Sequence, residues 1–310
     1  MSMNNLSINQ NSEENLSLRV ACKELYSHAK KWLYVEVGLG VIVGVMYIIY
    51  TFSNPIFSFL HSNINQYWLF PLITPIISII FTLIDNYLIS SKIKINIEKA
   101  AYVQEIFDRN VFELPDNKIM IPSFESVIFI MNKDKLYEFK DWYDVKISSV
   151  PIEVGRVIAQ KSNCVWDNNL KNDFSNTLGA IVLILFALLI IAQCHTYDFK
   201  SFILGAISLL YNANLFLKYR KAHISSKNEG IKLNNNINEV WNSTMKSKDI
   251  NTLIEASKDI QTQIFYHRTN TALVPDIFYK LRRNKHQDIT EICVDNMINE
   301  YNVNFAYINS

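Results

Sequence analysis

Glycine and proline are scarce in this chain, since each occurs seven times in 310 residues. Because these residues form many of the tight turns in proteins, the sequence has little material for a turn-rich all-β fold. Only 19% of the residues are charged, whereas 49% are hydrophobic. That hydrophobic share is high for a water-soluble protein of this length, so the composition favours helices, some of them in a membrane.

Cysteine is also sparse. No two cysteines form a CxxC pair, and none joins a histidine at the spacing of a metal site. We therefore expect free thiols in a reducing compartment, with no metal centre and no resident cofactor. The four residues are Cys22, Cys164, Cys194 and Cys293.

A strong net charge is missing as well. The formal charge is +1 and the isoelectric point is about 7.6, so no overall positive field attracts a polyanion, and we expect no DNA or RNA partner. The N-terminal stretch MSMNNLSINQNSEENLSLRV has neither the basic start nor the apolar run of a signal peptide. We expect this stretch to stay in the cytoplasm.

Four long apolar runs are present. Each is long enough to cross a hydrocarbon core of ~30 Å as a helix that rises ~1.5 Å per residue. A buried helix of a soluble protein rarely sustains such runs, so we predict four transmembrane helices in two hairpins, 33–90 and 177–217. The predicted spans are 33–52, 67–89, 177–194 and 201–217.

The basic residues fix the expected orientation of these spans. Of the 30 lysines and arginines, 29 lie in 1–32, 91–176 or 218–310. This asymmetry is the positive-inside pattern, and it places both termini in the cytoplasm. The predicted fold class is therefore an all-α integral membrane protein with a mostly helical cytosolic region. Its cytosolic parts are an N-terminal segment (1–32), a stalk and middle region (91–176) and a C-terminal helical region (218–310).

Two carboxylates lie within the predicted spans, Glu36 and Asp85, both near the cytoplasmic ends. At the bilayer centre a charged side chain costs ~2.5 to 3.5 kcal/mol on the insertion scale, but less near an interface. One interpretation is that both side chains reach interfacial water or a helix end. The other is that they line the pore or gate of an oligomer.

The middle cytosolic region contains a stalk helix at 91–110, a short strand at 126–132 (SVIFIMN) and a helix that starts after Pro151. On this last helix Arg156, Gln160, Asn163 and Asp167 are spaced to form one polar stripe. Such a stripe is typical of a solvated surface. Its arginine, glutamine and asparagine side chains also suit hydrogen bonding to a phosphate or a base edge.

In the C-terminal region, the sequence pattern of IQTQIFYHRTNTALVPDIFYKLRR, residues 260–283, predicts a helical hairpin. Its first helix has an apolar stripe that ends near Ile264, with His267 at the margin of that stripe. Gln261 and Arg268 are seven residues apart and share a face. Pro275 starts the second helix, and three of its apolar residues are expected to pack back on the first helix, namely Ile277, Phe278 and Leu281.

Several fragments together resemble one family. LYSHAK, VQEIFDRNVFELP, FKDWY, PIEVGRVIAQKSNCVWDNNL and the hairpin sequence occur in order around four spans, from about residue 10 to about residue 285. This set is similar to the SMODS-associated four-transmembrane effector family. The chain departs from the family at TNTALVPDIFY, where members more often have serine and proline after the basic residue and a tryptophan near Phe278.

The resemblance implies an effector of the bacterial inner membrane in a CBASS antiphage system. Such an effector binds a cyclic oligonucleotide made by a neighbouring nucleotidyltransferase and then damages the membrane, which halts the infected cell. An activating nucleotide needs cations for its phosphates and aromatic faces for its bases. For each candidate an ordinary packing or surface role is the more common one. The candidate ligand-binding residues are Lys140, Trp142, Arg156, Gln160, Trp166, Gln261, Arg268 and Arg282.

Two alternatives remain open. In an enzyme, His267 acts as a general base, but the sequence contains no GxSxG, HExxH, Walker or paired-carboxylate motif, so we predict no catalytic residues. In a membrane-anchored scaffold or a constitutive channel, the spans act without sensing a nucleotide. Four spans with few polar groups are too little for a monomeric aqueous pore, so a channel of either type implies a homo-oligomer in the lipid bilayer.

Overall fold

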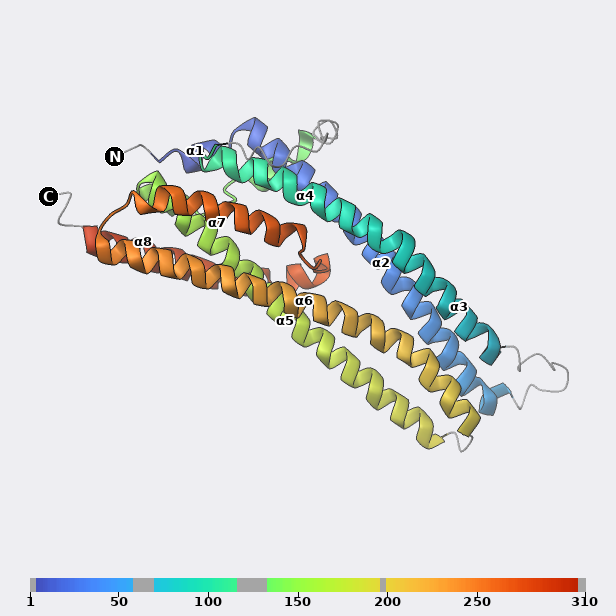
Figure 1. The fold of residues 1–310 in the computed structure, drawn as a ribbon. Helices are drawn as coiled ribbons and strands as arrows, with labels where there is room; N and C mark the ends of the chain where they lie inside the picture. The colour runs from blue at the N-terminus through green and yellow to red at the C-terminus, as the bar shows by residue number, and fades with distance from the viewer. Residues whose placement is uncertain (1–3, 58–69, 116–132, 196–198, 306–310) are drawn as a thin grey trace. The chain divides into compact units, whose positions relative to one another are not determined.

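The computed structural model describes residues 4–57, 70–115, 133–195 and 199–305. Every regular element in these ranges is helical (Figure 1), which confirms the all-α prediction. The elements are α1 (Leu6–Gln10), α2 (Glu13–Phe57), α3 (Phe70–Ile84), the π-helix η1 (Asp85–Ile89), α4 (Ser90–Val111), the 3₁₀-helices η3 (Lys133–Phe139) and η4 (Val145–Ser149), α5 (Ile152–His195), α6 (Phe199–Ser247), α7 (Thr252–Thr269) and α8 (Asp276–Phe305).

Local sequence explains where several helices begin and end. Pro151 precedes α5 and its carbonyl accepts hydrogen bonds from the backbone N–H groups of Val154 and Gly155, as expected for proline at a helix start. Lys248 follows α6 with a φ of 56°, and Glu113 follows α4 with a φ of 53°. A residue in this left-handed conformation cannot continue a helix, so each marks a helix end.

The chain forms two compact units. Unit 1 comprises Met1–His28, Ile95–Asn172 and Ile224–Ser310, and unit 2 comprises Ala29–Lys94 and Asp173–His223. The chain passes between the units four times, and each passage lies inside a helix, namely α2, α4, α5 or α6.

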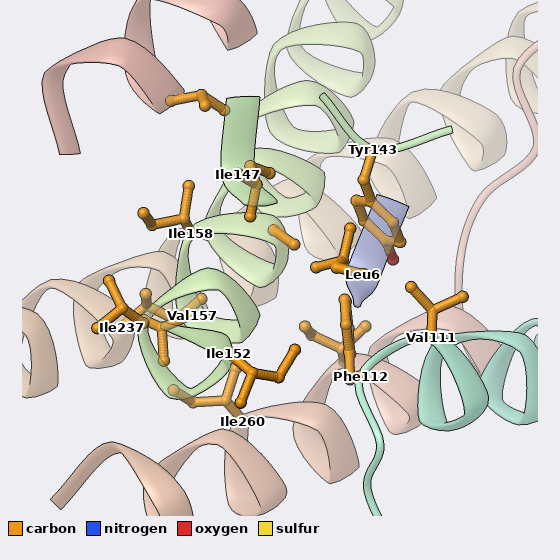
Figure 2. Close-up of a cluster of buried hydrophobic side chains, with 14 of the residues drawn as sticks. Leu6, Val111, Phe112, Tyr143, Ile147, Ile152, Val157, Ile158, Ile237 and Ile260 are labelled. Atoms are coloured by element: carbon orange, nitrogen blue, oxygen red, sulfur yellow. The ribbon is translucent and has the colours of Figure 1, made fainter. Parts of the chain in front are cut away.

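Unit 1 has an apolar core of the kind found in water-soluble helical proteins. The ring centroid of Tyr143 lies 5.1 Å from that of Phe112 and 6.2 Å from that of Phe107. Leu6 of α1 is completely buried beside Tyr143 and Phe112 (Figure 2). The apolar stripe predicted for α7 is buried, with Leu253, Ile260 and Ile264 at most 3% exposed. Other core residues are Val111, Ile147, Ile152, Val157, Ile158, Ile237, Val294 and Phe305.

Unit 2 differs from unit 1 in its surface. Many of its large apolar residues point outward, and Glu36, Asp85 and Asn212 are buried. Four of its apolar residues are buried with them, namely Leu33, Ile89, Leu178 and Leu215. Outward-facing residues include Val41, Ile42, Ile76, Ile79, Leu83, Tyr87, Leu88, Leu183, Ile184 and Phe186.

The predicted spans fall within α2, α3 with η1, α5 and α6, except that residues 67–69 lie outside the described residues. Among the residues that the structure describes, no helix combines the length and the apolar character needed to cross a membrane. The strand predicted at 126–132 also lies outside the described residues.

One packing prediction for the C-terminal hairpin is wrong. Ile277 is 74% exposed and Leu281 is 76% exposed, so neither packs back on α7. The second helix is far longer than the quoted hairpin, and α8 contributes to the core through its later turns. Its buried residues are His286, Val294, Met297, Ile298, Tyr301 and Phe305.

Candidate functional site

The main cluster of polar side chains in unit 1 is buried between α4, α5 and α7, and we call it the inner polar network. It consists of Glu105 and Asp108 of α4, Gln160 of α5, and Gln261 and Arg268 of α7. These helices bring the side chains together because each residue lies on the inward face of its helix, next to an apolar core position.

Asp108 is the centre of this network and is completely buried. Its Oδ2 atom accepts hydrogen bonds from Arg268 Nη1 at 2.5 Å and from Gln261 Nε2 at 3.2 Å. Its Oδ1 atom accepts one from the hydroxyl of Tyr143 at 2.7 Å. The prediction that Gln261 and Arg268 share a face is therefore confirmed, and both contact the same carboxylate.

Glu105 and Gln160 extend the network on either side of Gln261. Gln261 Nε2 donates to Glu105 Oε2 at 2.7 Å, while Gln160 Nε2 donates to Gln261 Oε1 at 3.1 Å. Glu105 Oε1 also accepts from Arg109 Nε at 2.6 Å. Gln160 also donates to the backbone carbonyl of Ser257 at 2.8 Å.

At the charged residues of this network, burial and the oppositely charged partners have opposing effects on the pKa. Burial raises the pKa of Glu105, partly opposed by the hydrogen bond from Gln261 and by Arg109. Burial by itself lowers the pKa of Arg268, but Asp108 and the nearby Tyr143 phenol raise it above its ordinary value. Two guanidinium groups thus balance two carboxyl groups, and such a balanced arrangement is the condition for burying charges in a folded protein.

This arrangement is suited to holding helices together rather than to binding a ligand. Gln160 and Gln261 are completely buried, and both amide nitrogens donate to protein acceptors. The first half of the polar stripe of α5, Arg156 and Gln160, therefore faces the protein interior, whereas the side chain of Asp167 is 35% exposed. Its first residue, Arg156, donates to the backbone carbonyls of Phe112 and Glu113 and secures the end of α4.

A second polar cluster, the Asp167 cluster, joins α5 to α7. Asp167 Oδ2 lies 2.5 Å from Lys171 Nζ and 2.8 Å from His267 Nε2, and Lys171 is 1% exposed. Burial by itself raises the pKa of Asp167, but Lys171 and His267 hold it well below its ordinary value. His267 therefore does not pack at an apolar margin as predicted, because α5 supplies polar partners that its own helix does not reveal.

The remaining predicted ligand-binding residues lie elsewhere in unit 1. Lys140 is exposed, with its Nζ 4.8 Å from the ring centroid of Tyr137. Arg282 is exposed beside Phe278. The ring of Trp166 is half-buried and contacts Tyr279 and His286, and Trp142 is 38% exposed beneath the guanidinium of Arg19. The structure thus unites three candidates, Gln160, Gln261 and Arg268, and leaves the others apart.

Unit 2 contains a third group, which we call the ion cluster. Lys218 Nζ of α6 lies 3.0 Å from Glu36 Oε1 of α2 and 2.8 Å from Asp85 Oδ2 of η1. The hydroxyl of Tyr219 donates a hydrogen bond to Glu36, and the hydroxyl of Ser90 donates one to Asp85. The two predicted intramembrane carboxylates therefore share one cation, and Asp85 begins a π-helix, a deformation often found at functional sites.

Sequence reasoning missed Glu105, Asp108 and Arg109, and also Arg19 and Lys218. The first three lie in VQEIFDRNVFELP, one of the fragments that carries the family resemblance. A charged residue at an inward position of a helix with an otherwise apolar face is the pattern that could have revealed them. Arg19 lies among buried positions of α2 and fits the same description.

The fold and these clusters define an all-helical protein with a conventionally packed unit and a unit that turns apolar side chains outward. The chain matches the SMODS-associating 4TM effector domain over residues 4–297 and belongs to that family. It is 29% identical over 291 residues to a probable CBASS effector molecule of Bacillus cereus (strain VD146), which covers 90% of this chain and 93% of that protein. No solved structure matches. Family membership supports an antiphage effector role, and the family name implies membrane localisation.

Proposed function

We propose that this protein is a membrane effector that binds a cyclic oligonucleotide through unit 1 and permeabilises the inner membrane through unit 2. In this proposal both termini are cytoplasmic, the chain crosses the bilayer at the four apolar runs, and several copies assemble into the permeable form. The nucleotide is the product of a nucleotidyltransferase encoded nearby, and the outcome is death or arrest of the infected cell.

The proposal that unit 2 lies in the membrane rests on the distribution of side chains in that unit. Ile79 is 62% exposed, Leu183 is 71% exposed and Phe186 is 60% exposed, whereas Glu36 is 1% exposed. A surface of this kind is unfavourable in water, because soluble proteins rarely expose large contiguous apolar patches. In a bilayer the same surface contacts lipid, and polar groups face the bundle interior.

The ion cluster is suited to act as the gate of such an assembly. Glu36 and Asp85 belong to helices that are distant in sequence, and Lys218 holds both of them to α6. Buried charges in membrane helices are expensive unless paired, so separating these helices requires new partners such as water or ions. Movement of α6 relative to the two carboxylates therefore favours a hydrated opening.

Membrane potential in living cells tests the proposal directly. A potential-sensitive dye should report depolarisation when the protein is produced together with its neighbouring nucleotidyltransferase, and none when either is produced alone. Depolarisation by the protein alone would indicate a constitutive channel. No depolarisation under any condition, with protein present in the membrane, would favour a scaffold and refute the proposal.

A catalytic alternative follows from the Asp167 cluster, because a carboxylate that orients a histidine is a common arrangement for a general base. The histidine is largely enclosed, however, with its side chain 11% exposed. We propose that His267 is structural. His267→Gln should keep the toxicity of the activated protein, measured as colony counts at matched protein levels. Loss of toxicity in a variant that is present in the membrane at normal levels would support catalysis instead.

A further inference from the structure

Arg19 of α2 is a buried arginine whose hydrogen bonds are incomplete. The residue is 5% exposed, and among the described parts of the chain neither Nε nor Nη1 has a hydrogen-bond acceptor. Three other buried or half-buried arginines differ in this respect, since Arg109, Arg156 and Arg268 each donate to a carboxylate or a carbonyl. Leaving a charged donor buried without an acceptor is costly, so an unsatisfied group of this kind calls for an explanation.

Asp108, the residue that follows Phe107, already accepts hydrogen bonds from Arg268, Gln261 and Tyr143. The guanidinium of Arg19 instead lies over aromatic rings, with its carbon 3.4 Å from the ring centroid of Trp142 and 5.2 Å from that of Phe107. Aromatic faces attract the cation but do not accept its in-plane N–H groups.

Trp142 is held over Arg19 by both of its neighbours in the chain. The backbone of Tyr143 exchanges two hydrogen bonds with the side chain of Gln10, at 2.7 and 3.1 Å. Asp141 exchanges two with the side chain of Asn11, at 2.8 and 3.0 Å. Asp141 also has a φ of 52°, in the left-handed region that aspartate adopts more readily than most non-glycine residues. The backbone on both sides of Trp142 is therefore held in place.

The Trp142 side chain is nevertheless 38% exposed, so it covers the guanidinium on one side and faces solvent on the other. Lys140, an exposed cation, precedes Trp142 by two residues in the chain. Burial raises the pKa of Tyr279, and both Arg283 and Arg19 oppose this rise, so a second guanidinium shares the surroundings of that phenol with Arg19.

We propose that Arg19 is the phosphate contact of the activating nucleotide and that Trp142 is the aromatic cover that moves off Arg19 and stacks on a base. This inference rests on the proposed nucleotide sensing and names residues that perform it. A phosphate offers two oxygen acceptors in the geometry of the arginine fork, which completes the hydrogen bonds that the protein leaves open. A tryptophan face stacks on any base, so the pair recognises both parts of a nucleotide.

A binding experiment on the full chain in lipid nanodiscs tests this assignment. The probes are cyclic di-AMP, cyclic di-GMP, cyclic GMP–AMP and cyclic tri-AMP, measured by calorimetry and by tryptophan fluorescence. Arg19→Met should lower the affinity for the bound probe about 10- to 100-fold, the value of a hydrogen bond to a charged group. Arg19→Lys keeps the charge without the fork and should lose about 10-fold. Trp142→Phe should abolish the fluorescence change that accompanies binding.

The control is Lys258→Met, which removes a half-buried cation paired with Glu255 and should leave affinity unchanged. Thermal unfolding separates ligand binding from packing. Because Arg19 is buried with open hydrogen bonds, Arg19→Met should unfold at the same temperature as the natural chain or higher. A fall of more than about 4 °C would mean that Arg19 is structural and would overturn the inference.

The outcomes also distinguish the inference from the proposal on which it rests. If the natural chain binds none of the four probes, nucleotide sensing itself fails. If it binds one of them and both Arg19 variants bind equally well, sensing stands and Arg19 is not the phosphate contact.

Discussion

Replacing Arg268 by methionine tests whether the inner polar network stabilises unit 1. Methionine keeps most of the side-chain volume and removes the charge, which leaves the carboxylate of Asp108 completely buried without its cation. At an effective dielectric constant of ~20, unit charges ~4 Å apart attract by ~4 kcal/mol, and removing one member of a buried pair typically costs ~3 to 5 kcal/mol. Asp108 retains donors from Tyr143 and Gln261, so we expect a loss near the lower value, about 3 kcal/mol.

The matched double variant isolates the charge from the packing. Adding Asp108→Asn to Arg268→Met removes the buried charge that the single variant leaves behind, so the double variant should be more stable than Arg268→Met alone. Unfolding by guanidinium chloride, followed by helical circular dichroism on the full chain in detergent, gives the three free energies. A loss below about 1 kcal/mol in Arg268→Met, or a double variant no more stable than the single, would refute this reasoning.

Two further predictions concern the other parts of the fold. Lys218→Met leaves the two carboxylates of the ion cluster without their shared cation, so the melting temperature of this variant in detergent should fall by at least about 5 °C. The control variant Lys221→Met replaces an exposed lysine and should not change the melting temperature measurably. Equal effects of the two variants would contradict a structural ion cluster. Gly155→Ala places a methyl group 2.8 Å from Asn4 Nδ2, which donates to two backbone carbonyls. It should cost ~1 to 3 kcal/mol in denaturant unfolding, whereas Gly38→Ala, with no atom within 4 Å, should be neutral or stabilising.

The sequence was a good guide where local pattern determines structure. Helical periodicity correctly identified the buried apolar stripe of α7 that ends at Ile264, and Pro151 correctly marked the start of α5. The ordered family fragments correctly indicated the family to which the chain belongs. These features depend on neighbours within one helix, so a single sequence contains the necessary information.

Side-chain partners from distant helices could not be predicted in the same way. The stripe on α5 is polar in the sequence, but Gln160 is completely buried, and its amide nitrogen donates to Gln261, about a hundred residues later. His267 likewise meets Asp167 from another helix. A polar residue with a matching buried partner and one with water as partner look alike in sequence. Only the tertiary arrangement distinguishes them.

The four passages of the chain between the units have a mechanical consequence. Since each lies inside α2, α4, α5 or α6, no loop at these points absorbs a rotation of the backbone. Each helical residue turns the chain by ~100° and advances it by ~1.5 Å. A rotation of α5 about its axis near Gln160 is therefore passed on to the later turns of the same helix. Inserting a single residue at a passage would rotate the helix after the insertion by more than a quarter turn relative to the helix before it. The two units are therefore joined by continuous helices rather than by flexible loops.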